Sequence, residues 1–472
     1  MQSPPSPRPI SKLLPLLVMA LPGIVFYILL IPQLVNIPIQ DDYYAVLDFM
    51  NAYAKSHGIK GRLTVLATNQ HGPYKLLFEH VLYITQYSVI GHINFIGLVA
   101  FGSLFITALV ILLSRTALGG VPEDKRSWLL VVPIAFLMFQ LQYAGAVDWA
   151  MTSLQHVPVI FFSILALWLT SRDTAPAFTG ACVSTLLAIA ASTNGFAVVP
   201  LIAILLIKQR RYRWIPALLL VVAIAGATYA WRYNPHQKIE NHILLPERLR
   251  AEHHGVLVVV SYFFAFLGSP ATNTHILAPA IVFGMGLTAL FVVAAARRYD
   301  RVNPAVFYSI AFLLITAAGV ALLRSKLGAY EALDSHYRIY SATLLTLSFI
   351  FVAQTVWTSG RPQETKIAIL SFALIISVPF CLVSDRIGYR LLKTHRQEFT
   401  RGMLIWERPD LIPPDVPPVR DSVGEDRLTH VYDPFGGIVR ESERLGVYTP
   451  PVLKPPPGSI PRSPDEPYRE FR

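Results

Sequence analysis

Long, nearly uncharged apolar runs alternate with short polar segments along most of the chain. Two of the clearest runs are 13–31 (LLPLLVMALPGIVFYILLI) and 276–296 (ILAPAIVFGMGLTALFVVAAA). Each approaches the roughly 20 apolar residues that a helix needs to cross the hydrocarbon core of a bilayer. Within lipid every backbone N–H and C=O group must be paired internally, so these runs must be helices. The pattern therefore predicts an all-α, polytopic transmembrane bundle.

About eleven runs are predicted to cross the membrane. Their approximate bounds are 13–35, 92–113, 128–142, 151–170, 179–192, 195–207, 214–230, 276–296, 304–324, 338–358 and 366–384. The first run is interpreted as a span and not a signal sequence, because it is long and no clear small-x-small cleavage site follows it. A further apolar run, 255–267, is only about 13 residues long, a length that favours a re-entrant or interfacial segment.

The distribution of Lys and Arg predicts the orientation, because these residues concentrate in cytoplasmic loops. Basic loops lie at 115–127, 208–213 and 296–301. Placing all three loops and the N-terminus inside leaves one crossing between 254 and 296, which agrees with the shortness of 255–267. The sequence thus predicts a multi-pass protein of the inner (plasma) membrane with a cytoplasmic N-terminus, a large first outer loop at about 36–91 and an outward C-terminal tail.

Composition supports a membrane protein and argues against other classes. Hydrophobic residues make up 53% of the 472 residues and charged residues 15%, whereas soluble domains carry about 25% charged residues. The net charge of +11 follows from the basic loops between spans, so no nucleic-acid partner is expected. Cys182 and Cys381 both fall in apolar runs, which disfavours a disulfide or metal framework.

The last part of the chain differs in kind from the rest. Residues 1–384 are interpreted as the membrane domain, and residues 385–472 carry proline-rich stretches such as DLIPPDVPPV and TPPVLKPPPGSIPRSP. Proline at this density disfavours helix interiors and favours extended, solvated chain. A largely irregular tail is predicted, with one short helix possible near 438–445.

An acidic pair, Asp41 and Asp42, stands at the start of the first outer loop. Apolar residues follow it at helical spacing (Tyr43, Val46, Leu47 and Met50), which predicts an amphipathic helix on the membrane surface. One of the two acids could be a helix N-cap. A cap does not need both, so either is also a candidate for a general base or a metal ligand.

Further along this loop lie His71, Lys75, Glu79 and His80. On a helix beginning near Pro73, Lys75 and Glu79 would share a face, as a surface ion pair does. His71 and Lys75 are alternatively candidates for substrate or phosphate binding. The loop has no H-x-x-x-H or C-x-x-C spacing, so zinc is weakly indicated and no metal ligand is assigned.

The late outer loop and the start of the next span read RSKLGAYEALDSHYRIYS, residues 324–341. Arg338 opens an apolar span, where a charge is costly unless it is paired or reaches the interface. Arginine also offers a planar fork of donors suited to phosphate. Candidate substrate or phosphate-binding residues here are Lys326, His336, Tyr337 and Arg338. Asp148 and Trp149 stand at the outer end of the third span without an assigned role.

Taken together, these features resemble the GT-C class of polytopic glycosyltransferases of bacterial envelopes. The resemblance rests on the acidic pair Asp41–Asp42, on NQHGPYKLLFEH (69–80), on SHYRIYS (335–341) and on the topology. Related bacterial sequences carry an Asn-Glu-His-Arg-like run where this chain has Asn-Gln-His-Gly (69–72). They carry Arg where it has His336.

The resemblance implies transfer of a sugar from a polyprenyl-phosphate donor to an envelope glycan or lipid acceptor on the outer face, with inversion. Asp41 or Asp42 would be the general base, and basic groups of the later loops would neutralise the departing phosphate. No cofactor is certain, and a divalent metal is possible. The alternatives are a non-enzymatic lipid or solute transporter and a scaffold of a polysaccharide export complex.

Overall fold

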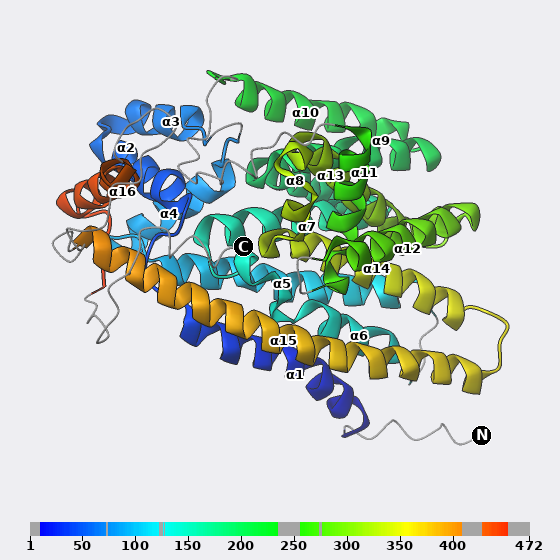
Figure 1. Ribbon diagram of the computed structural model, residues 1–472. Coiled ribbons are helices and arrows are strands. Elements are labelled where there is room, and N and C mark those ends of the chain that lie inside the picture. The colour runs from blue at the N-terminus through cyan, green and yellow to red at the C-terminus, as the bar shows by residue number, and fades with distance from the viewer. Residues whose placement is uncertain are drawn as a thin grey trace.

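A computed structural model describes residues 10–71, 74–121, 126, 128–234, 255–272, 276–407 and 427–451. The described residues are helical almost throughout, and their one β-bridge joins His71 to Tyr74. Figure 1 shows long helices packed side by side, with α2, α3, α4 and α16 gathered at one end of the molecule. An all-α fold, as predicted from the apolar runs, is therefore confirmed.

The α-helices have the following bounds: α1 Ile10–Leu30, α2 Phe49–Lys55, α3 Gly58–Thr68, α4 Leu77–Ile90, α5 Phe95–Leu118, α6 Trp128–Met138, α7 Ala150–Thr170, α8 Ala175–Ala191, α9 Val198–Lys208, α10 Ile215–Ala230, α11 Val256–Gly268, α12 Leu277–Ala296, α13 Pro304–Arg324, α14 Arg338–Trp357, α15 Gln363–Glu407 and α16 Arg427–Arg444. A π-helix, Tyr43–Asp48, precedes α2, and short 3₁₀ turns include Leu141–Ala146 and Ser335–Tyr337.

Seven described helices are long and apolar enough to cross a membrane, which makes this a multi-pass membrane protein. They lie at Phe95–Leu118, Ala150–Thr170, Tyr212–Ala230, Leu277–Ala296, Pro304–Leu327, Ser335–Trp357 and Gln363–Gln397. The other four predicted spans coincide with shorter apolar helices, as does the run 255–267, which forms the 13-residue helix α11. The number of eleven crossings therefore stays a prediction.

The three basic loops used to predict orientation lie at one end of the bundle. Lys208 Nζ lies 2.6 Å from Asp300 Oδ2, which joins the second loop to the third. Asn303 Nδ2 donates to the carbonyl of Thr116 at 3.1 Å, which joins the third loop to the end of α5. This common end agrees with the alternation of crossings predicted from the charges, while the assignment of that end to the cytoplasm stays a prediction.

The first outer loop folds against protein. Val46, Leu47 and Met50 are fully buried, where the sequence predicted an apolar face lying on the membrane. Part of their cover comes from the far end of the chain, because α16 packs on the π-helix and α2. Asn51 Nδ2 donates to the carbonyl of Ile438 at 3.1 Å, and Lys55 Nζ lies 2.7 Å from Glu441 Oε1.

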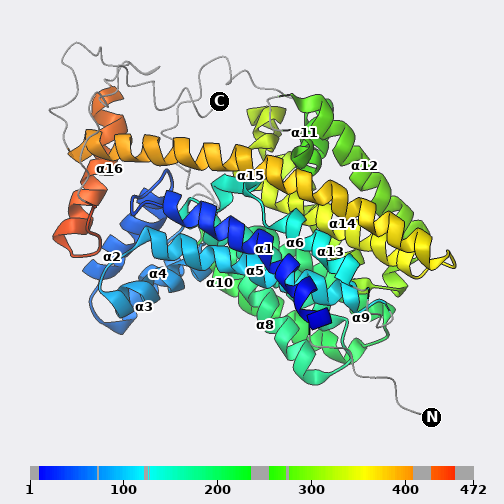
Figure 2. The same ribbon diagram turned by 90° about the horizontal axis from the view of Figure 1, so that it is seen from below.

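The C-terminal region is more helical than its proline content suggested. Helix α15 continues to Glu407, past residue 385 where irregular chain was expected, and Figure 2 shows it running along the molecule towards α16. The first proline after 385 is Pro409, and the residue before a proline disfavours helical backbone. The described part of the helix therefore extends to within two residues of the first proline. Residues 408–426 and 452–472 lie outside the described residues.

Candidate functional site

Asp42 is a helix cap, but for a distant helix. Its carboxylate accepts hydrogen bonds from the backbone N–H of Met151 at 2.9 Å and of Ala150 at 3.4 Å, at the start of α7. The N–H of Ile39 donates to it at 3.3 Å. The side chain is fully buried, and this burial raises its pKa to about 8, although the three amides act in the opposite direction. Asp42 thus satisfies N–H groups that a helix start otherwise leaves unpaired.

Asp41, the other member of the acidic pair, remains accessible. Its side chain is 33% exposed, and its Oδ2 atom lies 3.5 Å from Nε2 of His71, whose side chain is only 8% exposed. His71 is held by two backbone hydrogen bonds with Tyr74, of 2.8 and 3.0 Å. A turn precedes the pair in which Gln40 has a φ of +46°, a conformation that costs a non-glycine residue free energy. Of the two acids, Asp41 is therefore the one whose carboxylate reaches solvent.

Lys75 has a structural environment. Its fully buried ammonium donates to the carbonyls of Ala67 at 3.1 Å, Thr228 at 3.0 Å and Trp231 at 2.5 Å. These carbonyls end α3 and α10, where a cation is favoured by the helix dipole. Burial lowers the pKa of Lys75. All three N–H donors of the ammonium are used by backbone carbonyls. This environment differs from the phosphate-binding role that the sequence predicted for Lys75.

The predicted ion pair between Lys75 and Glu79 is absent among the described residues. Helix α4 begins at Leu77, so Lys75 precedes the helix and does not share a face with Glu79. Both side chains are fully buried, where a surface pair was expected. The expectation was wrong because it placed the helix start at Pro73.

Arg324, His336 and Arg338 of the late outer loop each contact one of the acids of that loop. Arg324 Nη1 donates to Glu331 Oε1 at 2.8 Å, and its guanidinium lies 5.5 Å from the ring centre of Tyr337. His336 Nδ1 lies 2.9 Å from Asp334 Oδ1. Arg338 also interacts with Asp334, and its Nε donates to the carbonyl of Leu333 at 3.0 Å.

Two other candidates of this loop differ sharply in environment. Lys326 is exposed, whereas Tyr337 is buried against His336. The ring of His336 also stacks at 5.6 Å on that of His156 in α7. The described part of the loop therefore presents Lys326 to solvent and holds Arg338, His336 and Tyr337 against the protein.

The first and late outer loops meet around the start of α7. Asp42 binds the N–H groups of Ala150 and Met151, while the ring of Trp149 lies edge-on to His336 at 6.3 Å. Ser335 Oγ accepts a hydrogen bond of 3.2 Å from the N–H of Gly145, a few residues before α7. The side chain of Tyr74 interacts electrostatically with Arg324 and Tyr337. Sequence segments nearly 300 residues apart thus surround one helix terminus.

A buried acid–histidine pair beside this terminus was not found from sequence. Asp148 Oδ2 lies 2.6 Å from Nδ1 of His395, and both side chains are about one-tenth exposed. The sequence position of Asp148 indicates no role, and His395 falls in the stretch that the sequence predicts to be irregular. The continued helical pattern beyond 385 was the only signal that could have placed His395 near the bundle.

The same region offers few ligands for a metal. The described residues contain no group of three or more His, Cys, Asp and Glu side chains able to hold a metal ion. Asp41 and His71 supply two potential ligands, fewer than the three protein ligands of a catalytic zinc site. A metal requirement therefore finds no support among these side chains.

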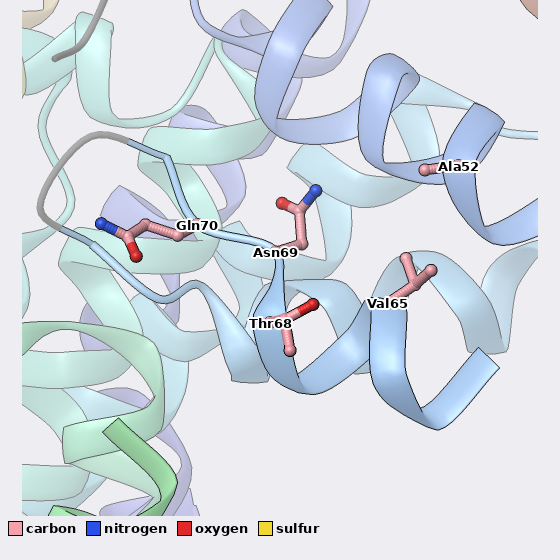
Figure 3. A pocket seen from close by; sticks show the side chains of 5 residues that line it. All are labelled: Ala52, Val65, Thr68, Asn69 and Gln70. Carbon is pink, nitrogen blue, oxygen red and sulfur yellow. The ribbon is translucent and has the colours of Figure 1, made fainter. Parts of the chain in front are cut away.

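A hollow of about 290 Å³ lies between α2, α3 and the segment that follows α3. Its lining residues are Ala52, Val65, Thr68, Asn69 and Gln70. Figure 3 shows Ala52 and Val65 on facing helices and Asn69 projecting between them and Gln70. The lining is uncharged, in contrast with the late outer loop.

Comparisons with known proteins do not identify a relative, since no family model, curated protein or solved structure matches the chain.

Proposed function

We propose that this protein is a membrane glycosyltransferase of the GT-C type. It transfers a sugar from a polyprenyl-phosphate donor to an envelope glycan or lipid acceptor on the non-cytoplasmic face. The observation that carries the proposal is the meeting of the two outer loops around the start of α7. Such a transfer needs a base on the acceptor side and cations on the phosphate side of one reacting carbon, and the two loops supply these separately.

Asp41 is the proposed base, and Asp42 supports it. Asp41 removes the proton of an acceptor hydroxyl, the hydroxyl oxygen attacks the anomeric carbon, and the bond from that carbon to the phosphate oxygen breaks with inversion. The leaving group is polyprenyl phosphate, whose negative charge Arg338 and the exposed Lys326 neutralise. Asp42 is committed to the N–H groups of α7, so its contribution is to hold the adjacent residue in place.

The adjacent carboxylates make a matched experiment. Purified wild-type protein, Asp41→Asn and Asp42→Asn are compared in nanodiscs, with radiolabelled polyprenyl-phosphate hexoses as donors and lipid-free envelope glycan as acceptor. Asp41→Asn should lower the transfer rate by about 10²- to 10⁴-fold, the usual contribution of a general base, at unchanged abundance. Asp42→Asn should instead lower thermal stability. Unchanged transfer and unchanged abundance in both variants would overturn the proposal.

A transporter is the second candidate, and one feature favours it. Helix α6 ends at Met138, and an irregular stretch with buried Gln140, Gln142 and Tyr143 separates it from α7. Interrupted helices with buried polar groups are common at the binding sites of transporters. Uptake of labelled donor lipid or sugar into proteoliposomes without any transfer product would favour this candidate.

A further inference from the structure

Helix α3 presents apolar side chains on its outward face. Ile59 and Leu63 are 80% and 58% exposed, and no residue of α3, which the structure describes throughout, is buried. The two side chains are four residues apart, so they lie on one face of the helix. Val65 and Thr68 lie on the opposite side, where they line the hollow towards α2. The apolar stripe of Ile59 and Leu63 is therefore directed away from the protein.

Two exposed cations border this apolar stripe. At about 100° per residue, Lys60 and Arg62 lie about 80° to either side of the line midway between Ile59 and Leu63, and both are exposed. The stems of such long basic side chains can cover apolar surface while their charged ends reach polar surroundings. An apolar stripe flanked by Lys and Arg is typical of a helix that lies against a lipid surface.

The charge around α3 has one sign. Residues 49–78 contain three Lys and one Arg but neither Asp nor Glu. Lys55 is neutralised by Glu441, whose Oε1 atom lies 2.7 Å away, and Lys75 is fully buried against backbone carbonyls. Lys60 and Arg62 thus remain at the surface of this segment to attract an anion. Their charge is complementary to that of acidic phospholipid headgroups.

The C-terminal end of α3 is fixed at the end of a membrane-crossing helix. The ammonium of Lys75 donates both to the carbonyl of Ala67 in α3 and to that of Trp231, directly after α10. Helix α10 belongs to the segment Tyr212–Ala230, which is long and apolar enough to cross a membrane. Trp231 is 58% exposed, and Trp concentrates where the hydrocarbon of a bilayer meets its headgroups. This end of α3, which Figure 1 shows just beyond the end of α10, therefore lies at the membrane surface.

We propose that α3 binds anionic phospholipid of the leaflet on the side of the first outer loop. Ile59 and Leu63 enter between the acyl chains, and Lys60 and Arg62 bind the headgroup phosphates. The membrane contact that the sequence predicted for the helix after Asp42 thus falls on α3. The bound lipid holds the first outer loop at the membrane surface, whether or not the protein transfers a sugar.

The contact is measured with the fluorophore NBD attached to Leu63→Cys in the full-length protein in nanodiscs. The nanodiscs contain a small fraction of phosphatidylglycerol or phosphatidylcholine that carries a nitroxide quencher on its acyl chain. Ile59→Cys provides a second label on the apolar stripe, and Thr68→Cys provides a control label on the opposite side of α3. Wild-type protein treated in the same way gives the background from Cys182 and Cys381, the two native cysteines.

Both nitroxide lipids should quench the two labels on the apolar stripe and leave the control label much brighter. Phosphatidylglycerol should quench these two labels at lower concentration than phosphatidylcholine, by about 5-fold for each of the two cations. Lys60→Gln and Arg62→Gln together should abolish this preference, while quenching by both lipids persists. Arg213→Gln, which removes an exposed cation at the opposite end of the bundle, should leave the preference unchanged.

Four results would overturn the proposal. Equal quenching of all three labels would show that the apolar stripe does not direct α3 into lipid. Equal quenching by the two lipids, with Lys60 and Arg62 in place, would exclude a preference for anionic lipid. Labels quenched by aqueous iodide but by neither lipid would place α3 in water. Labels quenched by neither iodide nor lipid would show that protein, such as a second copy of this chain, covers the stripe.

Discussion

The two ends of the helix bundle bury polar side chains in different ways. At the end with the basic loops, buried Gln354 donates to the carbonyls of Ala117 at 2.6 Å and Thr116 at 3.3 Å. Its Oε1 atom accepts from Asn303 Nδ2 at 3.1 Å and from the hydroxyl of Tyr299. Every polar atom of the Gln354 amide is thus used to join three helical segments.

At the other end, Glu79, His80 and Tyr83 of α4 are fully buried, and none of their side-chain polar atoms has a hydrogen-bond partner among the described residues. Burial raises the pKa of Glu79 well above its ordinary value of 4.5 and lowers that of His80 to about 3. Burial thus favours the neutral form of both groups, which avoids the large cost of an unpaired buried charge.

Buried polar side chains thus have different roles at the two ends of the bundle. A network whose donors and acceptors all match specifies one packing arrangement. Unmatched groups stabilise nothing by themselves, and a folded protein usually keeps few of them. Here the unmatched groups lie within the first outer loop, which also carries Asp41. Substitutions in the matched network at the opposite end should therefore lower stability without lowering activity.

The largest expected effect on stability comes from Gln354→Leu. It leaves the carbonyls of Thr116 and Ala117 and the donors of Asn303 and Tyr299 without their partner, and each such loss costs about 1–3 kcal/mol. We expect a loss of about 3 kcal/mol or more, with transfer per folded molecule unchanged. Thermal unfolding in detergent measures it, with Thr355→Val, which loses one local hydrogen bond, as the control. A reduced transfer rate at wild-type stability would contradict the proposed difference between the two ends of the bundle.

Lys75→Met should have the next largest effect, because it tests a matched group inside the outer loop. Three carbonyls lose a charged donor, so we expect a loss of about 2 kcal/mol in the free energy of unfolding, with an unchanged donor KM. Lys60→Met, at an exposed position of α3, is the control. If Lys75→Met raises the donor KM and leaves stability intact, Lys75 binds phosphate after all.

Near pH 5, Glu79→Gln should have the smallest effect of the three variants on the free energy of unfolding, and the effect should grow as the pH rises. Because the pKa of Glu79 is raised in the folded protein, the native state holds a proton that the unfolded state releases above pH about 4.5. Its contribution to stability is therefore fully present below this pH and falls as the pH rises. Glutamine keeps the shape without the proton.

The variant should accordingly gain on the wild type as the pH rises above about 4.5, by at most about 1.4 kcal/mol for each pH unit. Asp42 and His80 titrate in both proteins, so the difference between the two stability curves isolates Glu79. Curves that stay parallel across this range would show that Glu79 is ionised in the folded protein.

Much of the architecture could be predicted because apolar runs and basic loops are local signals. The eleven predicted spans all coincide with apolar helices, and the basic loops lie at one end. The role of Asp42 was not predictable in this way. Sequence spacing suggested a cap for the helix that follows it, whereas its partner Met151 is 109 residues away, and nothing local identifies that partner.

Lys75 and His395 illustrate two further limits. The environment of Lys75 depends on where α4 begins, which is Leu77. Helix boundaries are the least reliable part of a prediction from sequence. His395 was missed because the high proline content of the whole tail was applied to a stretch, 385–407, that contains no proline. The position of Lys75 was mispredicted because the sequence does not mark the start of α4. His395 was missed because the proline content was averaged over the whole tail.

The cap that Asp42 provides to α7 has a consequence for biogenesis. Asp42 emerges from the ribosome 109 residues before Met151, so the helix that it caps has not yet been made when its own segment is synthesised. Until α7 forms, Asp42 lacks the N–H partners of Ala150 and Met151. The segment around Asp42 can therefore reach its final packing only after the chain up to α7 has been made.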